Sequence, residues 1–455
     1  MNELEQLSKF IVDFNLAEAP ENVAEIAKIC VLDSLASAVG ASKDELIESI
    51  IKEYKAYYPD ENQVRVWGHD TGFPVMQGIF INALIGHRFE LDDVHTKSKT
   101  HIGTIVVPTA FCLAQSLNSS GKEFLEAVIC GYETMSRIGM GFGVASHRNK
   151  GWHVTSTAGT FGSAAAAAKL LKLDVNKTMH ALGMAGAQSF GLWAFLEDSA
   201  SSKILHPARA AASGAEAAIL ARAGMTGPVN ILDARDGGLY RAMSDEYDLS
   251  LVTKGLGSSY EILNMDIKPY PCCRSTHCAI DSALFLKKAY HPDIHGIQEI
   301  EVETYLVGYK QCGFTAGSKE PKTSAEAKFS TPYTVATALL YGEVTLQYFD
   351  GLKINDKKVQ NLLKKVKVLP NDTFTNRYPE HWGCRTKIKM TNGDNFEVEI
   401  KDALGSVFNP ISKNEIINKA VPLLNVGCEG NTEAIINKII NIEECNNLSG
   451  IVMYK

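Results

Sequence analysis

Several kinds of segment are absent from this 455-residue sequence, and each absence excludes a class of protein. No run of about 18 apolar residues occurs, which predicts that no segment spans a membrane. The chain opens Met1-Asn2-Glu3 and lacks the basic and apolar regions of a signal peptide, so we expect a cytoplasmic protein. The net charge of −7 gives no electrostatic reason to expect nucleic acid as a partner.

Motifs for common cofactors and for disulfide frameworks are also missing. No Gly-x-Gly-x-x-Gly motif follows an expected strand, and neither a Walker motif nor a Gly-x-Ser-x-Gly motif occurs, so we expect no nucleotide cofactor and no serine hydrolysis. The ten cysteines lack paired spacing except for Cys272 and Cys273, with Cys278 nearby. That pattern is typical of free thiols in a reducing cytoplasm.

Length and composition indicate a soluble enzyme with more than one domain. A chain of 455 residues exceeds one ordinary hydrophobic core, and 45% hydrophobic with 21% charged residues is typical of globular enzymes. The spacing of apolar residues predicts helices within 3–40 (two helices), 45–58, 74–90, 105–117, 121–139, 155–172, 176–190 and 204–223. We therefore expect an all-helical domain up to about residue 260.

The pattern changes in the later part of the chain, where strands are predicted among further helices. Alternating apolar and polar residues predict strands at 297–309 and 366–369, and an Asn-Gly turn predicts a hairpin over 385–400. Further helices are expected at 277–289, 323–341, 355–363, 412–425 and 431–443. We predict a mainly α fold with a large all-helical domain (1–262 and 405–455) and a smaller α+β domain (263–404).

Residues 151–216 combine cations with helices made of small residues. The runs 159–168 and 208–214 consist largely of alanine, glycine and serine, which lets helices pack backbone to backbone. His153 lies at an expected helix start, where the helix dipole favours a neutral imidazole and a bound anion. A hydrogen-bonded interior histidine is the alternative interpretation.

Three basic residues follow in the same segment. Lys203, His206 and Arg209 recur every third residue, which places them roughly along one helix face. A lysine held away from water can act as a base in catalysis. A solvated basic face is the alternative.

Acidic and imidazole side chains gather between residues 90 and 101. Glu90, Asp92 and Asp93 are followed by His95 and His101, a combination typical of a metal site or of acid–base catalysis. The spacing lacks the His-x-x-x-His and Glu-x-x-His patterns of a single helix, which makes a metal site the weaker interpretation. Helix-capping aspartates with solvated histidines are the alternative.

Residues 268–277 (Lys-Pro-Tyr-Pro-Cys-Cys-Arg-Ser-Thr-His) enter a predicted helix in an extended conformation, because each proline disfavours helix in the residue before it. Cys273 and Arg274 are expected at the N-terminus of that helix, where thiolates and bound anions are favoured. The adjacent spacing of the cysteines does not fit zinc. Tyr333 follows a proline within another expected helix and is either a packing residue or a catalytic one.

Five stretches, in the same order along the chain, resemble the MmgE/PrpD superfamily, whose members include 2-methylcitrate dehydratase, cis-aconitate decarboxylase and iminodisuccinate epimerase. These stretches are 87–95, 151–153, 159–167, 203–214 and 268–277. The resemblance spans essentially the whole chain. It implies that the smaller domain is a lid, that the active site lies in the cleft between the domains, that the enzyme is a homodimer, and that it needs no metal or organic cofactor.

The resemblance also implies a set of active-site positions. These fall on Glu90, Val94, His101, His153, Lys203, Cys273 and Tyr333. Val94 stands where members often carry a hydroxyl residue, and Cys273 stands where the decarboxylase carries a histidine, so the match to the decarboxylase is incomplete. We add Asp93, His206 and Arg274 to Glu90 as candidates for binding an anionic carboxylate substrate.

The reaction expected from the resemblance is proton transfer at a carbon next to a carboxylate. The resulting dianion needs preorganised cations, which we expect Lys203, His101 and Arg274 to supply. We predict a cofactor-independent lyase of the dehydratase type on a small di- or tricarboxylate, with His153 protonating the leaving hydroxyl. Two alternatives stay open: an epimerase of an aminodicarboxylate such as iminodisuccinate, which would pair Lys203 with His153, Cys273 or Tyr333, and a decarboxylase of a cis-aconitate-like acid.

Overall fold

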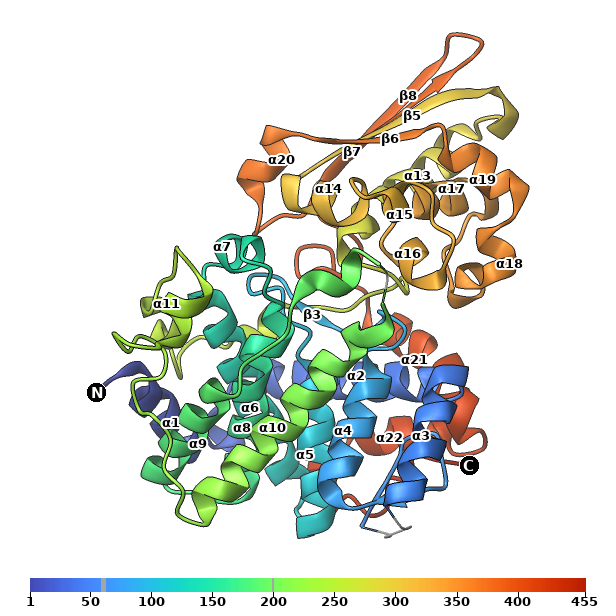
Figure 1. Cartoon of the computed structure of the whole chain (residues 1–455). Helices are drawn as coiled ribbons and strands as arrows, with labels where there is room; N and C mark the ends of the chain where they lie inside the picture. The colour runs from blue at the N-terminus through green and yellow to red at the C-terminus, as the bar shows by residue number, and fades with distance from the viewer. Residues whose placement is uncertain (59–62, 199) are drawn as a thin grey trace.

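The chain folds into two units of unequal size, each with its own hydrophobic core (Figure 1). A computed structural model describes residues 1–58, 63–198 and 200–455. The core of the large unit is drawn from residues 4–267 and 416–453, and that of the small unit from residues 272–403. The prediction of a mainly α fold with a smaller α+β part is confirmed.

The large unit is built almost entirely from helices. Its helices are α1 (Glu3–Asp13), α2 (Glu21–Ala41), α3 (Glu45–Tyr57), α4 (Val75–Gly86), α5 (Gly103–Leu117), α6 (Gly121–Gly141), α7 (Val144–Asn149), α8 (Val154–Leu170), α9 (Val175–Ala187), α10 (Leu205–Arg222), α11 (Leu239–Met243), α12 (Ser250–Thr253), α21 (Lys413–Cys428) and α22 (Thr432–Ile440). Two short strand pairs interrupt them, β1 (Val64–Arg65) with β2 (Gly72–Phe73) and β3 (Val94–His95) with β4 (Met265–Asp266).

Helices α8 and α10 pack closely because their facing residues are small. A Cβ atom added to Gly214 of α10 would lie 2.2 Å from the backbone oxygen of Thr160 in α8. Ser163 of α8 donates a hydrogen bond from Oγ to the carbonyl oxygen of Ala211 at 2.5 Å. This contact fixes the two helices relative to each other, and His153 and His206 lie at their N-terminal ends.

The small unit contains a four-stranded sheet in the order β6-β5-β7-β8. The strands are β5 (Ile297–Thr304), β6 (Val366–Pro370), β7 (Cys384–Met390) and β8 (Asn395–Ile400). Strands β5 and β6 pair in parallel, whereas β5–β7 and β7–β8 are antiparallel. The helices are α13 (His277–Tyr290), α14 (Leu306–Cys312), α15 (Ala316–Lys319), α16 (Ser324–Lys328), α17 (Thr331–Tyr341), α18 (Gly351–Ile354), α19 (Lys357–Leu363) and α20 (Asp372–Arg377). Among them, α13, α14 and α17 contact the sheet.

Two predicted elements of the small unit are wrong in extent. The strand expected at 297–309 ends at Thr304, and α14 begins at Leu306. The helix expected at 323–341 is two helices, because Ser330 caps a new helix by accepting a hydrogen bond from the backbone N–H of Tyr333. The break places Phe329 between α16 and α17.

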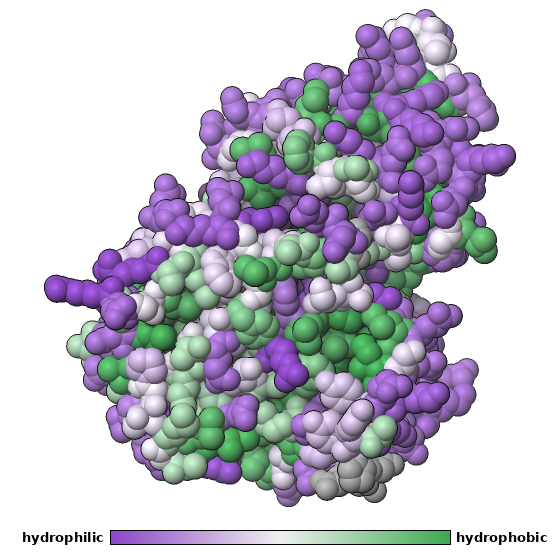
Figure 2. Space-filling model, viewed as in Figure 1, coloured by the Kyte–Doolittle hydropathy of each residue, from purple (hydrophilic) through white to green (hydrophobic). Residues whose placement is uncertain are grey.

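The two units differ in their surfaces. Figure 2 shows polar side chains over most of the small unit, and a hydrophobic patch on the large unit beside the N-terminal end of α10. Within the described ranges, every helix is too short or too polar to cross a lipid bilayer.

Candidate active site

Two cavities lie between the large and small units. One, the histidine cavity, has a volume of about 640 Å³ and is lined by side chains of both units. It brings together six of the nine predicted site residues: Glu90, His101, His153, Lys203, Cys273 and Arg274. The second cavity has a volume of about 840 Å³ and shares Glu90, Lys203 and Phe329 with the first, so these three residues separate the two spaces.

Lys203 and Glu90 form an ion pair at this dividing wall. Lys203 lies in a single turn of 3₁₀ helix (Ser201–Ile204) before α10, is only 7% exposed, and directs Nζ to Oε1 of Glu90. Burial alone would raise the pKa of Glu90, but the positive charge of Lys203 and further nearby cations hold it well below its usual value. Glu90 is therefore an ionised carboxylate that fixes Lys203, and its predicted role as a contact for an anionic substrate stays a prediction.

Lys268 is a second buried cation in the same cluster, and the sequence interpretation missed it. Its side chain is fully buried, and Nζ donates a hydrogen bond to the backbone oxygen of Glu90 at 3.0 Å. The same atom lies 3.9 Å from Glu90 Oε2 and 4.0 Å from Asp92 Oδ1. The signal was available, since Lys268 opens the extended segment that leads to Cys273.

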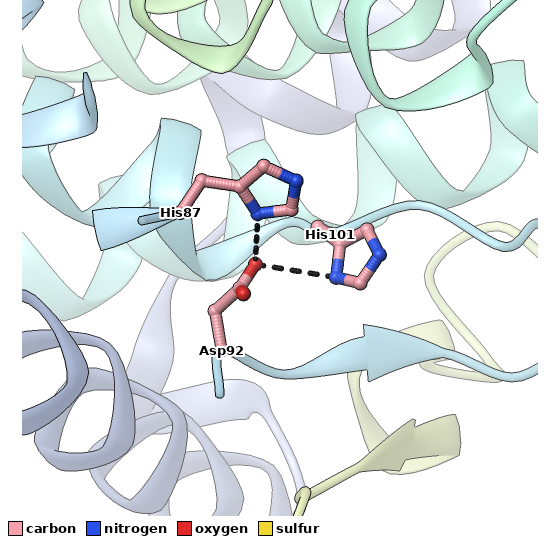
Figure 3. A group of neighbouring side chains, drawn as sticks. All are labelled: His87, Asp92 and His101. Carbon is pink, nitrogen blue, oxygen red and sulfur yellow. Dashed lines mark hydrogen bonds and ion pairs between the residues drawn. The ribbon is translucent and has the colours of Figure 1, made fainter. Parts of the chain in front are cut away.

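His87, Asp92 and His101 meet beside this cluster (Figure 3). Asp92 Oδ2 lies 2.8 Å from His87 Nδ1 and 3.2 Å from His101 Nδ1. Burial alone would raise the pKa of Asp92, but the two histidines and Lys268 hold it well below its usual value. The three ligand atoms lie within 4.8 Å of one another and could hold a metal ion, although the neighbouring ammonium of Lys268 opposes a divalent cation.

The hydrogen bonds of His101 define its tautomer. Nδ1 lies 2.9 Å from the backbone oxygen of Asp93 as well as near Asp92, and both partners are acceptors. Nδ1 therefore carries the proton, and Nε2 on the other side of the ring (Figure 3) is the basic nitrogen. Burial, assisted by the charge of Lys268, lowers the pKa of His101 to about 4. His101 is thus a neutral, oriented base at pH 7.

His153 and His206 form a second imidazole pair. His153 is the N-cap residue of α8, and its Nδ1 lies 2.9 Å from Nδ1 of His206 in the first turn of α10. Burial lowers the pKa of His206 to about 4 and that of His153 well below its usual value, so both rings are neutral at pH 7. Of the two, His153 lines the histidine cavity, and His206 supports it from behind.

The predicted basic face of Lys203, His206 and Arg209 does not act as one group. Lys203 binds Glu90, His206 contacts His153, and the guanidinium of Arg209 lies 4.9 Å from the centre of the Phe80 ring. The three-residue spacing predicts one helix face, but Lys203 precedes α10 in a tighter turn.

Cys273 and Arg274 come from the chain segment that enters the small unit. A hydrogen bond with Cys312, working against burial, lowers the pKa of the Cys273 thiol to about 7. Arg274 donates from Nε to Asp266 Oδ2 at 3.0 Å and from Nη1 to the backbone oxygen of Leu404 at 3.0 Å. Arg274 therefore lines the cavity with a guanidinium that is already anchored.

Among the described residues that line the two cavities, Asp93 and Tyr333 do not occur. Asp93 accepts hydrogen bonds from the Tyr132 hydroxyl at 2.7 Å and from the backbone N–H of Gly103 at 2.9 Å, and burial raises its pKa to about 7. Tyr333 is buried in the core of the small unit, where its hydroxyl donates to the backbone oxygen of Tyr348. Both residues therefore have structural contacts.

Comparison with protein families decides the relationship. Residues 5–252 match the MmgE/PrpD N-terminal domain, and residues 270–442 match the MmgE/PrpD C-terminal domain. The chain belongs to the MmgE/PrpD family. The resemblance inferred from the five short stretches is confirmed.

Curated relatives of the chain are enzymes. Cis-aconitate decarboxylase of Mus musculus is 28% identical over 456 residues, covering 95% of this chain and 89% of the relative. The cis-aconitate decarboxylase-like protein oryM of Aspergillus oryzae is 26% identical over 468 residues, covering 98% and 96%. Cis-aconitate decarboxylase of Homo sapiens is 26% identical over 469 residues, covering 98% and 94%. The similarity thus extends over both units.

Proposed function

We propose that this protein is a lyase that acts on a small di- or tricarboxylate by proton transfer at a carbon next to a carboxylate. The observation that carries the proposal is the charge of the histidine cavity. Its described lining contains the basic side chains Lys99, Arg148, Lys203 and Arg274 but a single carboxylate, Glu90, which is already paired. Such a cavity favours an anion with more than one negative charge.

The side chains of the cavity have the acid–base properties that this chemistry needs. His101 Nε2 takes a proton from the carbon, because Asp92 and the backbone oxygen of Asp93 hold the other nitrogen protonated. Lys203, fixed by Glu90, stabilises the negative charge that develops on the substrate carboxylate. Cys273, with a pKa of about 7, gives or takes a proton from the opposite wall. In this scheme Cys273 replaces His153 as the acid, since burial keeps His153 neutral.

The names of the relatives indicate which reaction of the lyase class to test first. The curated relatives are named as cis-aconitate decarboxylases, so a cis-aconitate-like acid is the first substrate to test. In decarboxylation the bond to one carboxylate breaks, CO₂ leaves, and a proton is returned to carbon. In dehydration of a hydroxy acid the carbon loses a proton and the hydroxide leaves as water. Both reactions use the same stabilised carboxylate.

The substrate panel that tests the proposal is cis-aconitate, citrate, 2-methylcitrate and aminodicarboxylates, each incubated with enzyme in heavy water and followed by NMR. We expect one of them to lose CO₂ or water. The matched control is Lys203→Met, which should be folded and inactive on the same substrate. A wild-type enzyme that leaves the whole panel unchanged, with neither bond cleavage nor deuterium uptake, contradicts the proposal.

Epimerisation of an aminodicarboxylate is the second candidate, and one observation favours it. His101 of the large unit and Cys273 at the entry to the small unit line the same cavity from different units, as a two-base epimerase requires. An epimerase would introduce deuterium into the substrate without loss of CO₂ or water. Cys273→Ser should slow either reaction, because Cys273 is a proton donor or acceptor in both schemes, so the product formed by the wild type separates the two candidates.

A further inference from the structure

Lys99 has an unusual position among the lysines of the histidine cavity. It lies in the loop between β3 and α5, and its ammonium nitrogen lies 3.4 Å from the ring centre of Tyr378 and 3.4 Å from that of Trp382. Nζ is buried and has no hydrogen-bond partner among the described residues. An ammonium that is removed from water without a partner is unfavourable unless a ligand supplies the missing contact.

The acidic group that acts on Lys99 most directly is already in use. Burial lowers the pKa of Lys99 well below its usual value, and the negative charge of Asp266 opposes this shift. Asp266 Oδ2 accepts a hydrogen bond from Arg274 Nε at 3.0 Å, and its Oδ1 accepts one from Thr96 Oγ1 at 2.7 Å and one from the backbone N–H of Val407 at 3.1 Å. Asp266 thus holds the neighbouring loops together and leaves the ammonium of Lys99 without a direct counter-ion.

Arg148 of α7 supplies a second cation near the same place. Its Nε is buried without a hydrogen-bond partner in the described part of the chain, and its guanidinium carbon lies 4.3 Å from the ring centre of Trp193. Arg148 also lies close enough to Tyr378 for the two groups to interact electrostatically, and Tyr378 in turn interacts with Cys273. Lys99, Arg148 and Cys273 therefore all interact with Tyr378 and line the same cavity.

We propose that Lys99 and Arg148 form a second carboxylate subsite of the histidine cavity, which binds a carboxylate of the substrate other than the one that faces Lys203. The inference rests on the proposed function and narrows it to substrates with at least two carboxylates. The aromatic rings of Tyr378, Trp382 and Trp193 hold the two cations in place while leaving their hydrogen-bonding capacity unused. A carboxylate between Lys99 and Arg148 would accept hydrogen bonds from both side chains.

Binding of two unreactive probes tests the subsite independently of turnover. Tricarballylate carries three carboxylates on a five-carbon chain, and pentanoate carries one carboxylate on a chain of the same length. Their dissociation constants are measured by calorimetry for the wild type, Lys99→Met, Lys99→Arg, Arg148→Met and Lys97→Met. Lys97 is the matched control, because it lies two residues away in the same loop and its side chain is 48% exposed.

We expect Lys99→Met and Arg148→Met to weaken tricarballylate binding about 10- to 100-fold, the range for one charge-assisted hydrogen bond, with no change for pentanoate. Lys99→Arg should restore most of the affinity, and Lys97→Met should match the wild type. Thermal unfolding of each variant shows whether it is folded, and Arg148→Met carries the test if Lys99→Met does not fold.

Two other results overturn the inference, and they differ in their consequence. If Lys99→Met and Arg148→Met bind tricarballylate as tightly as the wild type, the two cations only hold the units together, and the proposed function stands without the subsite. If the wild type binds neither probe, the cavity is not a carboxylate site, and both the subsite and the proposed function fail.

Discussion

The buried lysines on the two sides of the histidine cavity differ in their partners. On one side, Lys268 lies fully buried against the backbone oxygen of Glu90 and within 4.0 Å of two carboxylates. On the other side, Lys99 lies between two aromatic rings with no hydrogen-bond partner among the described residues. A paired cation such as Lys268 stabilises the folded chain and orients its partners. An unpaired one contributes little until an anion arrives.

Lys203 belongs to the paired side, yet it borders the cavity where the substrate is proposed to react. The largest expected effect is therefore the loss of activity in Lys203→Met, with kcat reduced at least about 1,000-fold, as for removal of a major source of transition-state charge stabilisation. Single-turnover measurements on the substrate found in the panel provide the test, and circular dichroism checks the fold. A variant that keeps full activity removes Lys203 from the mechanism.

The paired and unpaired lysines should differ most clearly in stability. Lys268→Met leaves Glu90 and Asp92 buried with one cation fewer, so we expect the free energy of unfolding to fall by about 3 kcal/mol or more. Lys99→Met removes an ammonium without a hydrogen-bonded partner, and the expected loss is below about 1 kcal/mol. Urea unfolding measures both. Equal losses in the two variants would abolish the distinction between the two sides.

A smaller comparison within the paired side concerns two adjacent aspartates. Cations hold the pKa of Asp92 well below its usual value, whereas burial raises that of Asp93 to about 7. An unfolded aspartate titrates near pH 4, about 3.9. The folded chain therefore keeps a proton on Asp93 that the unfolded chain loses, and the stability gained from this proton is lost as the pH rises from about 4 to 7.

The resulting pH dependence is measurable in Asp93→Asn. The free energy of unfolding of the wild type should decrease with pH by up to about 1.4 kcal/mol per unit more steeply than that of the variant between pH 4.5 and 6.5. Only the difference is informative, because Glu133 adds to this slope, its pKa being about 7, while buried histidines with lowered pKa oppose it. Parallel curves for the two proteins would show that Asp93 is ionised when folded.

The smallest expected effect is that of a chelator. His87, Asp92 and His101 could hold a metal ion, but the hydrogen bonds to Asp92 and the nearby Lys268 favour a network of hydrogen bonds. We expect prolonged dialysis against EDTA to leave kcat/KM unchanged within twofold, with elemental analysis of the dialysed protein as the check. Loss of activity that returns with added Zn²⁺, Mn²⁺ or Fe²⁺ would assign a metal to these residues.

Elements whose pattern is local were predicted well from the sequence. The helix expected at 45–58 is Glu45–Tyr57, and the expected hairpin is formed by β7 and β8, because helical spacing and an Asn-Gly turn act over a few residues. The strand expected at 297–309 ends earlier than predicted, at Thr304, where the chain leaves the sheet. The alternation continues past Thr304, but Tyr305 leaves the sheet and its hydroxyl donates to Ser275.

The candidate site shows the same division. The family motifs predicted that His153, Lys203 and Cys273 share one site, and the structure has all three in the lining of the histidine cavity. Lys99 and Lys268 were missed, because their importance depends on the groups around them. From the sequence, a lysine in a polar loop is expected to be solvated. Only folding brings Tyr378 and Trp382, about 280 residues later in the chain, into contact with Lys99.

By itself, the sequence determined the helical character of the large unit, the α+β character of the small one, the close packing of helices rich in small residues, and membership of the family. These properties follow from periodicity, side-chain size and motif order, all of which depend only on the order of residues in the chain. Tertiary structure decided which charges are paired. That outcome depends on which groups lie within a few ångströms after folding, and it separates Lys268 from Lys99 and Asp92 from Asp93.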